Sequence, residues 1–297
     1  MGNLNVVVSL TTRENDYQAE QAAAVAETAA RLGVKIQIIY ADNDAVNQTL
    51  QLTRIIQDSA QRPDAILVEP VGTGMAQVAR AAVNAGIGWA IINSDPDYIP
   101  ELRRGGKIPV FSVSTDQFEV GKIQGKQLGV LVPKGNVLYI EGPSNSTAAQ
   151  LRTKGMMSTK PAGVELKILK GDWTERSAYQ VAKSWLSLGS SRQMHIQAVI
   201  CQNDAMAMGA RKAVAELPDK DREHWAATPF TGCDGVTKTG QEWVRRGFLT
   251  ATIITAPAAG NTLEMLVKAS DAHSLPPERT LIPPRSFPGI EELGSKR

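Results

Sequence analysis

Short apolar segments alternate with longer segments of helical periodicity along almost the whole chain. The first apolar segment, residues 4–10, is rich in Val and too short for a helix, a pattern typical of a buried strand. An Ala-rich segment with helical spacing follows over residues 17–32 and ends at Gly33, a residue type that often terminates helices. The beginning of the chain therefore predicts a strand followed by a helix.

The same order recurs as far as residue 272. Further strands are predicted at residues 35–41, 65–70, 89–93, 110–114, 136–141, 164–169, 198–201, 229–233 and 250–255. Helices are predicted at residues 44–60, 73–84, 116–131 and 258–272. Another helix is predicted to end near residue 158, and two more to begin at residues 174 and 204. Helices between successive strands require parallel pairing with right-handed crossovers. At 297 residues the chain is long enough for two domains, and the predicted fold is α/β, with two doubly wound parallel-sheet lobes.

The charge balance and the ends of the chain exclude some classes of protein. The chain carries 32 basic and 30 acidic residues without a basic stripe, so we expect no nucleic-acid partner. No apolar run approaches the ~18 residues of a membrane-spanning helix. Met1 and Gly2 lead directly into the first strand, without the apolar region of a signal peptide. This start is typical of a cytosolic protein, and equally of the mature form of an exported protein whose leader has been replaced.

Two cysteines, Cys201 and Cys233, lie in strand-like runs. Cys201 shares its strand parity with Asn203, whereas Cys233 has the opposite parity to Asp234. If Asn203 and Asp234 point to one site, the two sulfur atoms face different ways. We therefore predict two buried free thiols rather than a disulfide.

Polar residues gather at the carboxyl ends of the predicted strands, where ligands bind in open parallel sheets. The candidates are Asn15 and Tyr17 after the first strand, Asn93 and Asp95 after the fourth, and Arg152, Trp173, Asn203, Asp234 and Thr255 in the second half. Each hydroxyl of a polyhydroxylated ligand both donates and accepts, so carboxylates, amides and Arg suit it. The rings of Tyr17 and Trp173 could cover the C–H face of a sugar. Asp and Asn at strand ends also cap helices, and we interpret Asp116 and Asp204 as caps.

Motifs that would indicate catalysis are missing from the sequence. The first strand is not followed by G-x-G-x-x-G, and the chain has no Walker loop, G-x-S-x-G or H-E-x-x-H. Its three histidines, His195, His224 and His273, lie outside the set at the strand ends, and neither cysteine has a companion base or metal ligand. We therefore expect no catalytic residues, no metal site and no cofactor.

The segment Ala198-Val-Ile-Cys-Gln-Asn-Asp-Ala-Met-Ala-Met-Gly209 resembles a hallmark strand and helix start of the ribose-type periplasmic sugar-binding proteins. Residues 232–235, 247–253 with Pro257, and 66–70 support the resemblance, which covers nearly the whole chain. The family shares its fold with the effector domains of lac-repressor-type regulators. The resemblance implies a substrate-binding protein of an ABC-type importer that closes by a hinge around its ligand.

Carried over by position, the resemblance implies an N-terminal lobe of residues 1–115 plus 256–281 and a C-terminal lobe of residues 116–255 plus 282–297, with crossings near residues 115, 255 and 281 as the hinge. The implied ligand contacts are Asn15, Tyr17, Asn93, Arg152, Trp173, Asn203, Asp234 and Thr255. Asn203 and Asp234 are interpreted as ligand contacts on this ground.

The sequence departs from the family where a second aromatic residue would follow Tyr17, because Gln18 stands there. An Asp-Arg pair is replaced by Asn93-Ser94, and a hinge Gln by Thr255. A monosaccharide other than ribose, a polyol or a cyclitol fits these departures.

The resemblance also implies a partner and a location. The expected partner is an ABC permease or a chemoreceptor, and the expected location is periplasmic or extracellular, with or without a lipid anchor. We expect a monomer. An effector domain of a transcription regulator or a sugar sensor is the alternative, although a first strand at residue 4 leaves no room for a helix-turn-helix. A sugar-metabolising enzyme is disfavoured by the missing catalytic set.

Overall fold

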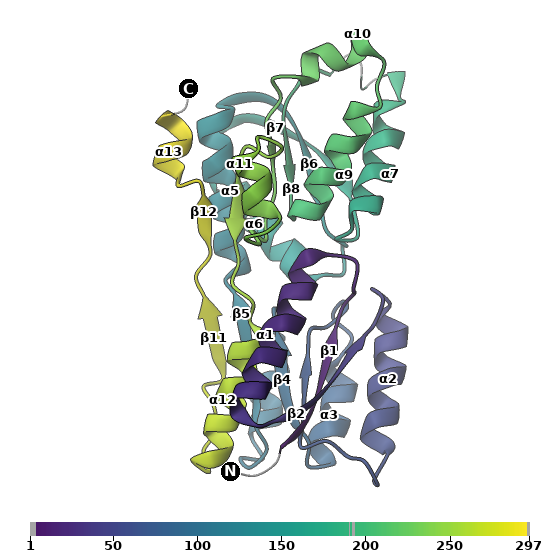
Figure 1. Cartoon of the computed structure of the whole chain (residues 1–297), viewed down its shortest axis with the longest axis vertical. Coiled ribbons are helices and arrows are strands. Elements are labelled where there is room, and N and C mark those ends of the chain that lie inside the picture. Colours follow the sequence, from purple (N-terminus) through teal and green to yellow (C-terminus); the bar gives the residue numbers. More distant parts are fainter. Residues whose placement is uncertain (1–3, 190, 192–193, 296–297) are drawn as a thin grey trace. The chain divides into compact units, whose positions relative to one another are not determined.

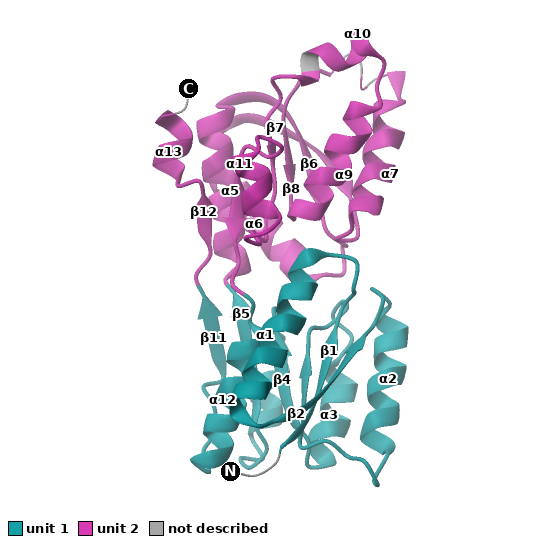
Figure 2. Ribbon diagram, viewed as in Figure 1, with its two compact units in different colours: residues 1–115, 257–282 teal, residues 116–256, 283–297 magenta. Residues whose placement is uncertain are grey.

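The chain forms two compact units in a computed structural model that describes residues 4–189, 191 and 194–295 (Figure 2). Unit 1 comprises Met1–Thr115 and Pro257–Ile282, and unit 2 comprises Asp116–Ala256 and Pro283–Arg297. The chain therefore passes from one unit to the other three times, after Thr115, Ala256 and Ile282.

Unit 1 is built on a six-stranded parallel sheet with the order β11-β5-β4-β3-β1-β2 (Figure 1). Its strands are β1 (Asn5–Leu10), β2 (Lys35–Tyr40), β3 (Ala65–Val68), β4 (Gly88–Ile92), β5 (Val110–Thr115) and β11 (Arg279–Ile282). Its helices are α1 (Asp16–Leu32), α2 (Ala45–Gln57), α3 (Ala76–Asn84), α4 (Ile99–Arg103) and α12 (Ala259–Asp271).

Helices cover both faces of this sheet, because its strands are apolar on both sides. Val6, Val8 and Leu10 pack against α1 and α12, whereas Val7 of the same strand packs against α2 and α3. Burial on both faces explains why these strands read as continuous apolar runs.

Unit 2 contains a four-stranded parallel sheet with the order β7-β6-β8-β9 and a two-stranded antiparallel pair, β10 with β12. The strands are β6 (Lys134–Glu141), β7 (Gly163–Lys170), β8 (Ile196–Cys201), β9 (Phe230–Thr231), β10 (Thr252–Ile254) and β12 (Arg285–Phe287). The helices are α5 (Gln117–Leu131), α6 (Thr147–Thr159), α7 (Glu175–Leu186), α9 (Asp204–Ala215), α10 (Asp219–Arg222), the 3₁₀ helix η1 (Glu223–Trp225), α11 (Gly240–Arg245) and α13 (Ile290–Ser295). The core formed with α7 and α9 lies on one face of the sheet, and that formed with α5 and α6 on the other.

The α/β fold with parallel sheets that the sequence predicts is confirmed. The tail after residue 275, where no element is predicted from the sequence, forms regular structure. It supplies β11, which pairs parallel with β5, then β12, which pairs antiparallel with β10, and finally the short helix α13. The antiparallel pair of β10 with β12 is an exception to the expected parallel pairing.

Both thiols are free and buried, which confirms the prediction for Cys201 and Cys233. Burial raises the pKa of each thiol far above its ordinary value, so both stay protonated at neutral pH. Among the described residues, no helix combines the length and the apolar character that crossing a bilayer requires.

Helices α5 and α6 approach each other closely at glycines. A Cβ atom on Gly155 would lie 2.1 Å from the carbonyl oxygen of Phe118, and one on Gly121 would lie 2.0 Å from the carbonyl oxygen of Arg152. Glycine is required at both positions because the neighbouring atoms belong to the backbone and cannot move aside. This contact fixes the part of α6 that carries Arg152.

We expect Gly155→Ala to lower the free energy of unfolding by about 1–3 kcal/mol, because the added methyl group forces the two helices apart. Urea denaturation followed by circular dichroism measures this change. The matched control is Gly129→Ala in α5, where a Cβ atom would meet only Pro161 Cγ at 3.6 Å. The control should be neutral or stabilising by up to about 1 kcal/mol, since Ala favours helix over Gly. A Gly155→Ala protein as stable as the wild type would contradict the packing described here.

Candidate functional site

The strand order of each unit creates a switch point at the carboxyl edge of its sheet. In unit 1, β1 lies between β2 and β3, so the connections after β1 and β3 leave in opposite directions. In unit 2, β6 lies between β7 and β8 in the same way. Ligands of open α/β sheets bind where such connections diverge. The candidate residues of each unit are therefore described at these two edges.

Tyr17 and Asn93 meet at the edge of unit 1. Tyr17, in the first turn of α1, and Asn93, directly after β4, are both buried, and the Asn93 Nδ2 atom lies 3.0 Å from the Tyr17 hydroxyl. Asn93 Nδ2 also donates to Glu69 Oε1 at 3.2 Å, and Gln21 Nε2 donates to the Tyr17 hydroxyl at 3.2 Å. The edge thus holds a connected group of a phenol, two amides and a carboxylate.

The backbone of Asn93 adopts a left-handed conformation with φ of 54°, which Asn tolerates better than most residues. The Asn93 N–H donates to the carbonyl oxygen of Val113 in β5 at 3.0 Å, so the pairing with β5 extends as far as Asn93 and the turn follows it along the chain. The turn brings the side chain of Asn93 to the edge of the sheet beside Tyr17.

Asn15 and Asp95 make different contacts. Asn15 is the N-cap of α1, and its Oδ1 accepts from the backbone N–H of Gln18 at 2.9 Å. The Asp95 carboxylate lies 2.8 Å from Arg279 Nε and accepts from Ser112 Oγ at 3.2 Å. Ser112 lies in the interior of β5, so the structure does not bring the Asp95 carboxylate into the Tyr17–Asn93 group.

A buried glutamine organises the edge of unit 2. Gln202 directly follows β8, and its Oε1 accepts from the backbone N–H of Gly142 at 2.9 Å. Its Nε2 donates to the hydroxyl of Tyr139 at 2.9 Å and to the carbonyl oxygen of Ala149 at 3.0 Å. Burial raises the pKa of Tyr139 to about 12, so this hydroxyl stays neutral. The network ties the end of β6 and the start of α6 to the end of β8.

Arg152, Trp173 and Asn203 are brought together by this framework. Arg152 is buried, its Nε donates to Gln117 Oε1 at 2.8 Å, and its Nη1 donates to the carbonyl oxygen of Gln202. The Arg152 guanidinium lies 5.4 Å from the centre of the Trp173 ring, within cation–π range. Asn203 Nδ2 donates to the carbonyl oxygen of Trp173 at 2.9 Å.

The position of the Trp173 ring depends on Gly142. A Cβ atom on Gly142 would lie 2.3 Å from Trp173 Cζ2, so the ring packs against the bare Cα of that glycine. Trp173 has a left-handed φ of 73°, an unusual conformation for a bulky residue. The bond from Asn203 therefore holds Trp173 in a conformation that it would otherwise rarely adopt.

Asp234 and Thr255 lie next to each other at the end of β9 and β10. The Thr255 backbone N–H donates to the carbonyl oxygen of Asp234 at 3.1 Å, and the Asp234 N–H donates to that of Ile253 at 2.9 Å. The Asp204 backbone N–H donates to the carbonyl oxygen of Cys233 at 2.6 Å, which joins the segment that carries Asn203 to the segment that carries Asp234. Arg152, Trp173, Asn203 and Asp234 thus occupy one region of unit 2.

Asp204 holds the backbone that presents Asp234. Asp204 Oδ2 accepts from the backbone N–H of Gly235 at 2.8 Å, and its Oδ1 accepts from Thr252 Oγ1 at 2.7 Å. A Cβ atom on Gly232 would lie 2.1 Å from Asp204 Oδ1, and one on Gly240 would lie 2.0 Å from Asp204 Oδ2. The carboxylate is enclosed by glycines, and Asp234 beside it has a φ of 113°.

The two expected capping aspartates have different outcomes. Asp116 is the N-cap of α5 and accepts from the N–H of Glu119 at 2.9 Å, as predicted. The same prediction for Asp204 is wrong. Asn203 is the cap, since its Oδ1 accepts from the N–H of Met206 at 2.8 Å, and Asp204 is the first helical residue.

Four residues at the two edges are not among the site residues predicted from the sequence: Glu69, Gln21, Gln117 and Gln202. Glu69 directly follows β3 before Pro70, so its strand-end position was a usable signal. Gln21 lies one helical turn after Tyr17, and that spacing also predicts a shared face. Gln202 directly follows β8 and carries the same strand-end signal as Glu69. Gln117 shows no such pattern, because its role depends on its contact with Arg152, which is distant in the chain.

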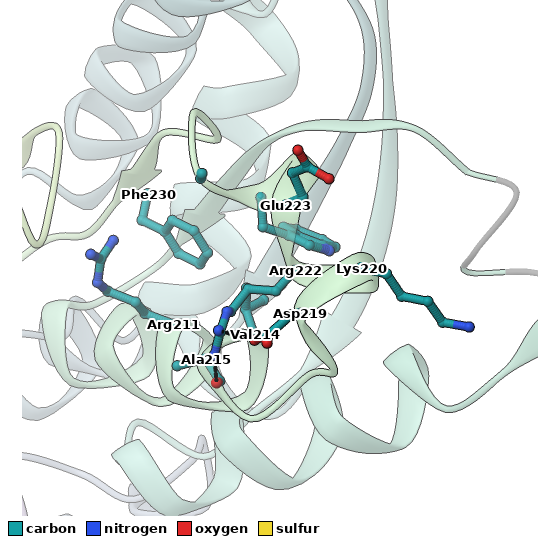
Figure 3. A pocket seen from close by; sticks show the side chains of 10 residues that line it. Arg211, Val214, Ala215, Asp219, Lys220, Arg222, Glu223 and Phe230 are labelled. Atoms are coloured by element: carbon teal, nitrogen blue, oxygen red, sulfur yellow. Dashed lines mark hydrogen bonds and ion pairs between the residues drawn. The ribbon is translucent and has the colours of Figure 1, made fainter.

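A cavity of about 540 Å³ lies elsewhere in unit 2, among α9, α10, η1 and the start of β9 (Figure 3). Its lining includes Arg211, Asp219, Arg222, Glu223 and Phe230, and none of the predicted ligand residues. Arg222 is paired with Asp219 and donates to the carbonyl oxygen of Ala215 at 3.0 Å. The Lys220 side chain extends away from the other labelled residues (Figure 3). The cavity lacks the convergent polar groups found at the sheet edges.

Both edges have the chemistry of a hydrogen-bonding site. They combine amides, carboxylates, a guanidinium and aromatic rings on rigid elements. Such groups recognise ligands that donate and accept at several points. The fold and these edges are those of a two-unit ligand-binding protein of the α/β class.

Comparison with known proteins identifies the family. Residues 6–272 match the model of the periplasmic binding protein domain, so the chain belongs to that family. The chain is 30% identical over 192 residues to a putative rhizopine-binding protein of Rhizobium meliloti, a match that spans 61% of this chain and 58% of the relative. It is 25% identical over 281 residues to the D-allose-binding periplasmic protein of Escherichia coli (strain K12), covering 91% of this chain and 86% of the relative.

A solved structure shares the fold over the full length of the chain. It is an ABC transporter solute-binding protein from Bacillus halodurans C-125 with bound myo-inositol, and the TM-score is 0.79. The match covers 100% of this chain and 99% of that chain, at 22% sequence identity. The fold of a periplasmic binding protein is thereby established for this chain.

We expect Asp204→Ala to lower the free energy of unfolding by about 3 kcal/mol, because it leaves the Gly235 N–H and the Thr252 hydroxyl buried without an acceptor. Asp204→Asn retains one acceptor oxygen and should recover at least half of this loss. Urea denaturation of both variants checks the expectation. If both variants unfold at the wild-type urea concentration, Asp204 does not hold the Asp234 segment.

Proposed function

We propose that this protein is the substrate-binding protein of an ABC-type importer and that it binds a monosaccharide, polyol or cyclitol between its two units. The ligand-binding residues in this proposal are Asn15, Tyr17, Asn93, Arg152, Trp173, Asn203, Asp234 and Thr255. Asp95 is left out, because its carboxylate is engaged by Arg279 and Ser112.

One observation favours ligand binding at three of these residues. Six non-glycine residues of the described chain have a left-handed φ, and three of them are Asn93, Trp173 and Asp234. Such conformations cost free energy and cluster at ligand-binding sites, where the surrounding structure imposes them. Each of the three directly follows, or lies within three residues of, the carboxyl end of a strand. These three residues combine a strained backbone with a place near the carboxyl end of a strand. This combination favours a ligand-binding role over helix capping.

The proposed mechanism is hinge closure. The polar edge of one unit engages the ligand first, and the other unit then closes to complete the hydrogen bonds. Closure is favourable only with ligand present, since the ligand supplies hydrogen-bond partners to polar groups that closure removes from water. The three crossings after Thr115, Ala256 and Ile282 would form the hinge.

The ligand class follows from the side chains and is supported by the relatives. Amide and carboxylate groups in unit 1 and a guanidinium beside an indole ring in unit 2 suit a compact ring bearing several hydroxyls. The relatives named above include a D-allose-binding protein and a protein with bound myo-inositol. These relatives support a monosaccharide or a cyclitol as the ligand, beside the polyol that the proposal also includes.

The remaining parts of the proposal concern partners and location. We propose that the protein acts without catalysis, as a monomer in the periplasm or outside the cell, and delivers its ligand to an ABC permease or presents it to a chemoreceptor. Membership of the periplasmic binding protein domain family supports this assignment.

We expect calorimetry with D-allose, myo-inositol, D-ribose and xylitol to detect binding of at least one of them by the wild type. Asp234→Ala and Asn203→Ser should each weaken that binding at least tenfold, about 1.4 kcal/mol, by removing a ligand contact. Ser is used at position 203 because it preserves the helix cap and separates binding from stability.

The matched control is Glu223→Ala, in the cavity beside α10, which should leave the affinity unchanged. Wild-type affinity in both Asp234→Ala and Asn203→Ser would refute the site. If Glu223→Ala loses binding instead, the ligand site lies in that cavity.

A further inference from the structure

The cavity of about 540 Å³ in unit 2 is lined by an arginine whose hydrogen bonds are not made within the described chain. The described arginines that are buried or half-buried are Arg80, Arg103, Arg152 and Arg211. The first three donate to carboxylate, carbonyl or amide oxygens. Arg211 forms neither a hydrogen bond nor an ion pair with any residue that the structure describes. A half-buried guanidinium of this kind is a candidate for binding an anion from outside the chain.

Two phenylalanine rings position the Arg211 guanidinium. It lies 5.8 Å from the centre of the Phe230 ring and 5.7 Å from the centre of the Phe248 ring, within cation–π range. An aromatic face attracts the positive charge but accepts none of the N–H groups that lie in the guanidinium plane. Those N–H groups form a planar fork that matches the two oxygens of a carboxylate. Arg211 is therefore a positioned cation whose donors are available to a ligand.

The rest of the lining suits an apolar ligand body. Val214, Trp225 and Phe230 line the cavity and are themselves buried. In the close-up view, the Phe230 ring lies beside Arg211 (Figure 3). Small-molecule sites have volumes of roughly 300–1,000 Å³ and are mostly apolar, with a few polar groups that orient the ligand. The cavity has this size and this composition.

The other charged groups of the described lining do not oppose an anion. Asp219 is paired with Arg222, which offsets its charge. Arg222 also donates to the carbonyl oxygen of Ala215 at 3.0 Å, at the negative end of α9. Glu223 is exposed, and solvent screens its charge. Among the charged residues described in the lining, only Arg211 is half-buried, so the charge least screened by water is positive.

The cavity and the proposed sugar site lie at opposite ends of α9. Asn203 caps the N-terminus of this helix, whereas Arg211, Val214 and Ala215 lie toward its C-terminus. A helix rises about 1.5 Å per residue, so Arg211 lies about 12 Å further along the axis than Asn203. Spacings of three and four residues place Arg211, Val214 and Ala215 on one face of the helix. The cavity is therefore separate from the polar edge of unit 2.

We propose that this cavity binds a small carboxylate that carries an apolar ring. The carboxylate accepts a pair of parallel hydrogen bonds from Arg211, and the ring packs against Phe230 and Trp225. An uncharged ligand of the same shape lacks the charge-assisted bonds and binds more weakly. The proposal adds a second class of ligand to the proposed function and does not depend on it.

Calorimetry on the full chain tests the requirement for charge. The carboxylate probes are indole-3-acetate and 2-naphthoate, and each is matched by its uncharged amide, indole-3-acetamide or 2-naphthamide. We expect the wild type to bind at least one carboxylate, and to bind the matching amide at least tenfold more weakly. The two members of a pair have the same ring, so the comparison isolates the contribution of the charge.

Variants at Arg211 test the position of the site. Arg211→Gln should weaken carboxylate binding at least tenfold because the charge is lost, and Arg211→Lys should bind with intermediate affinity because it keeps the charge without the planar fork. The matched control is Arg246→Gln. Arg246 lies 4.7 Å from the centre of the Phe248 ring but does not line the cavity, so this variant should keep the wild-type affinity. The melting temperature without ligand shows whether each variant is folded.

Four outcomes would overturn the proposal. The wild type binds neither carboxylate, or it binds a carboxylate and the matching amide equally well. Affinity of Arg211→Gln within twofold of the wild type would place the carboxylate elsewhere on the protein. Equal losses of affinity in Arg246→Gln and Arg211→Gln would show that the anion binds beside Phe248, outside the cavity.

Discussion

The hydrogen-bonding requirement of polar groups buried at the carboxyl ends of parallel strands governs both units. Most such groups have a partner, which is another side chain in unit 1 and either a side chain or a backbone group in unit 2. Tyr17, Asn93 and Glu69 form one connected group, and Gln202 joins two strands and a helix in the other unit. These bonds hold the side chains in fixed positions, and side chains that are already ordered lose less entropy when they contact a ligand.

Close backbone contacts make this arrangement possible. The ring of Trp173 packs against Gly142, and the carboxylate of Asp204 packs against Gly232 and Gly240. The backbone of α5 packs against Gly155 in the same way. Because glycine has no Cβ atom, a side chain or a backbone segment can approach closely at each of these positions. The polar edge of unit 2 therefore depends on residues that carry no functional group of their own.

The sequence predicts the repeating elements and the parallel sheets well, because apolar runs and helical spacing are local signals. It does not predict β11 and β12, since short strands in a Pro-rich tail depend on pairing with β5 and β10, which are distant in the chain. Strand-end polarity is enough to select Tyr17 and Asn93, which the structure joins. It cannot show that Asp95 pairs with Arg279 or that Asn203 rather than Asp204 caps α9. The pairing of Asp95 with Arg279 joins segments far apart in sequence, and the Asp204 carboxylate is likewise engaged by Gly235 and Thr252, which are distant in the chain.

The central claim is that one ligand engages both units and draws them together. Small-angle X-ray scattering, with and without a saturating sugar or cyclitol from the calorimetric panel, tests it most directly. The radius of gyration should fall on addition of ligand in the wild type, and should not fall in a variant in which both Asn93 and Asp234 are replaced by Ala. A ligand that binds the wild type with measurable heat yet leaves the radius of gyration unchanged would contradict the account.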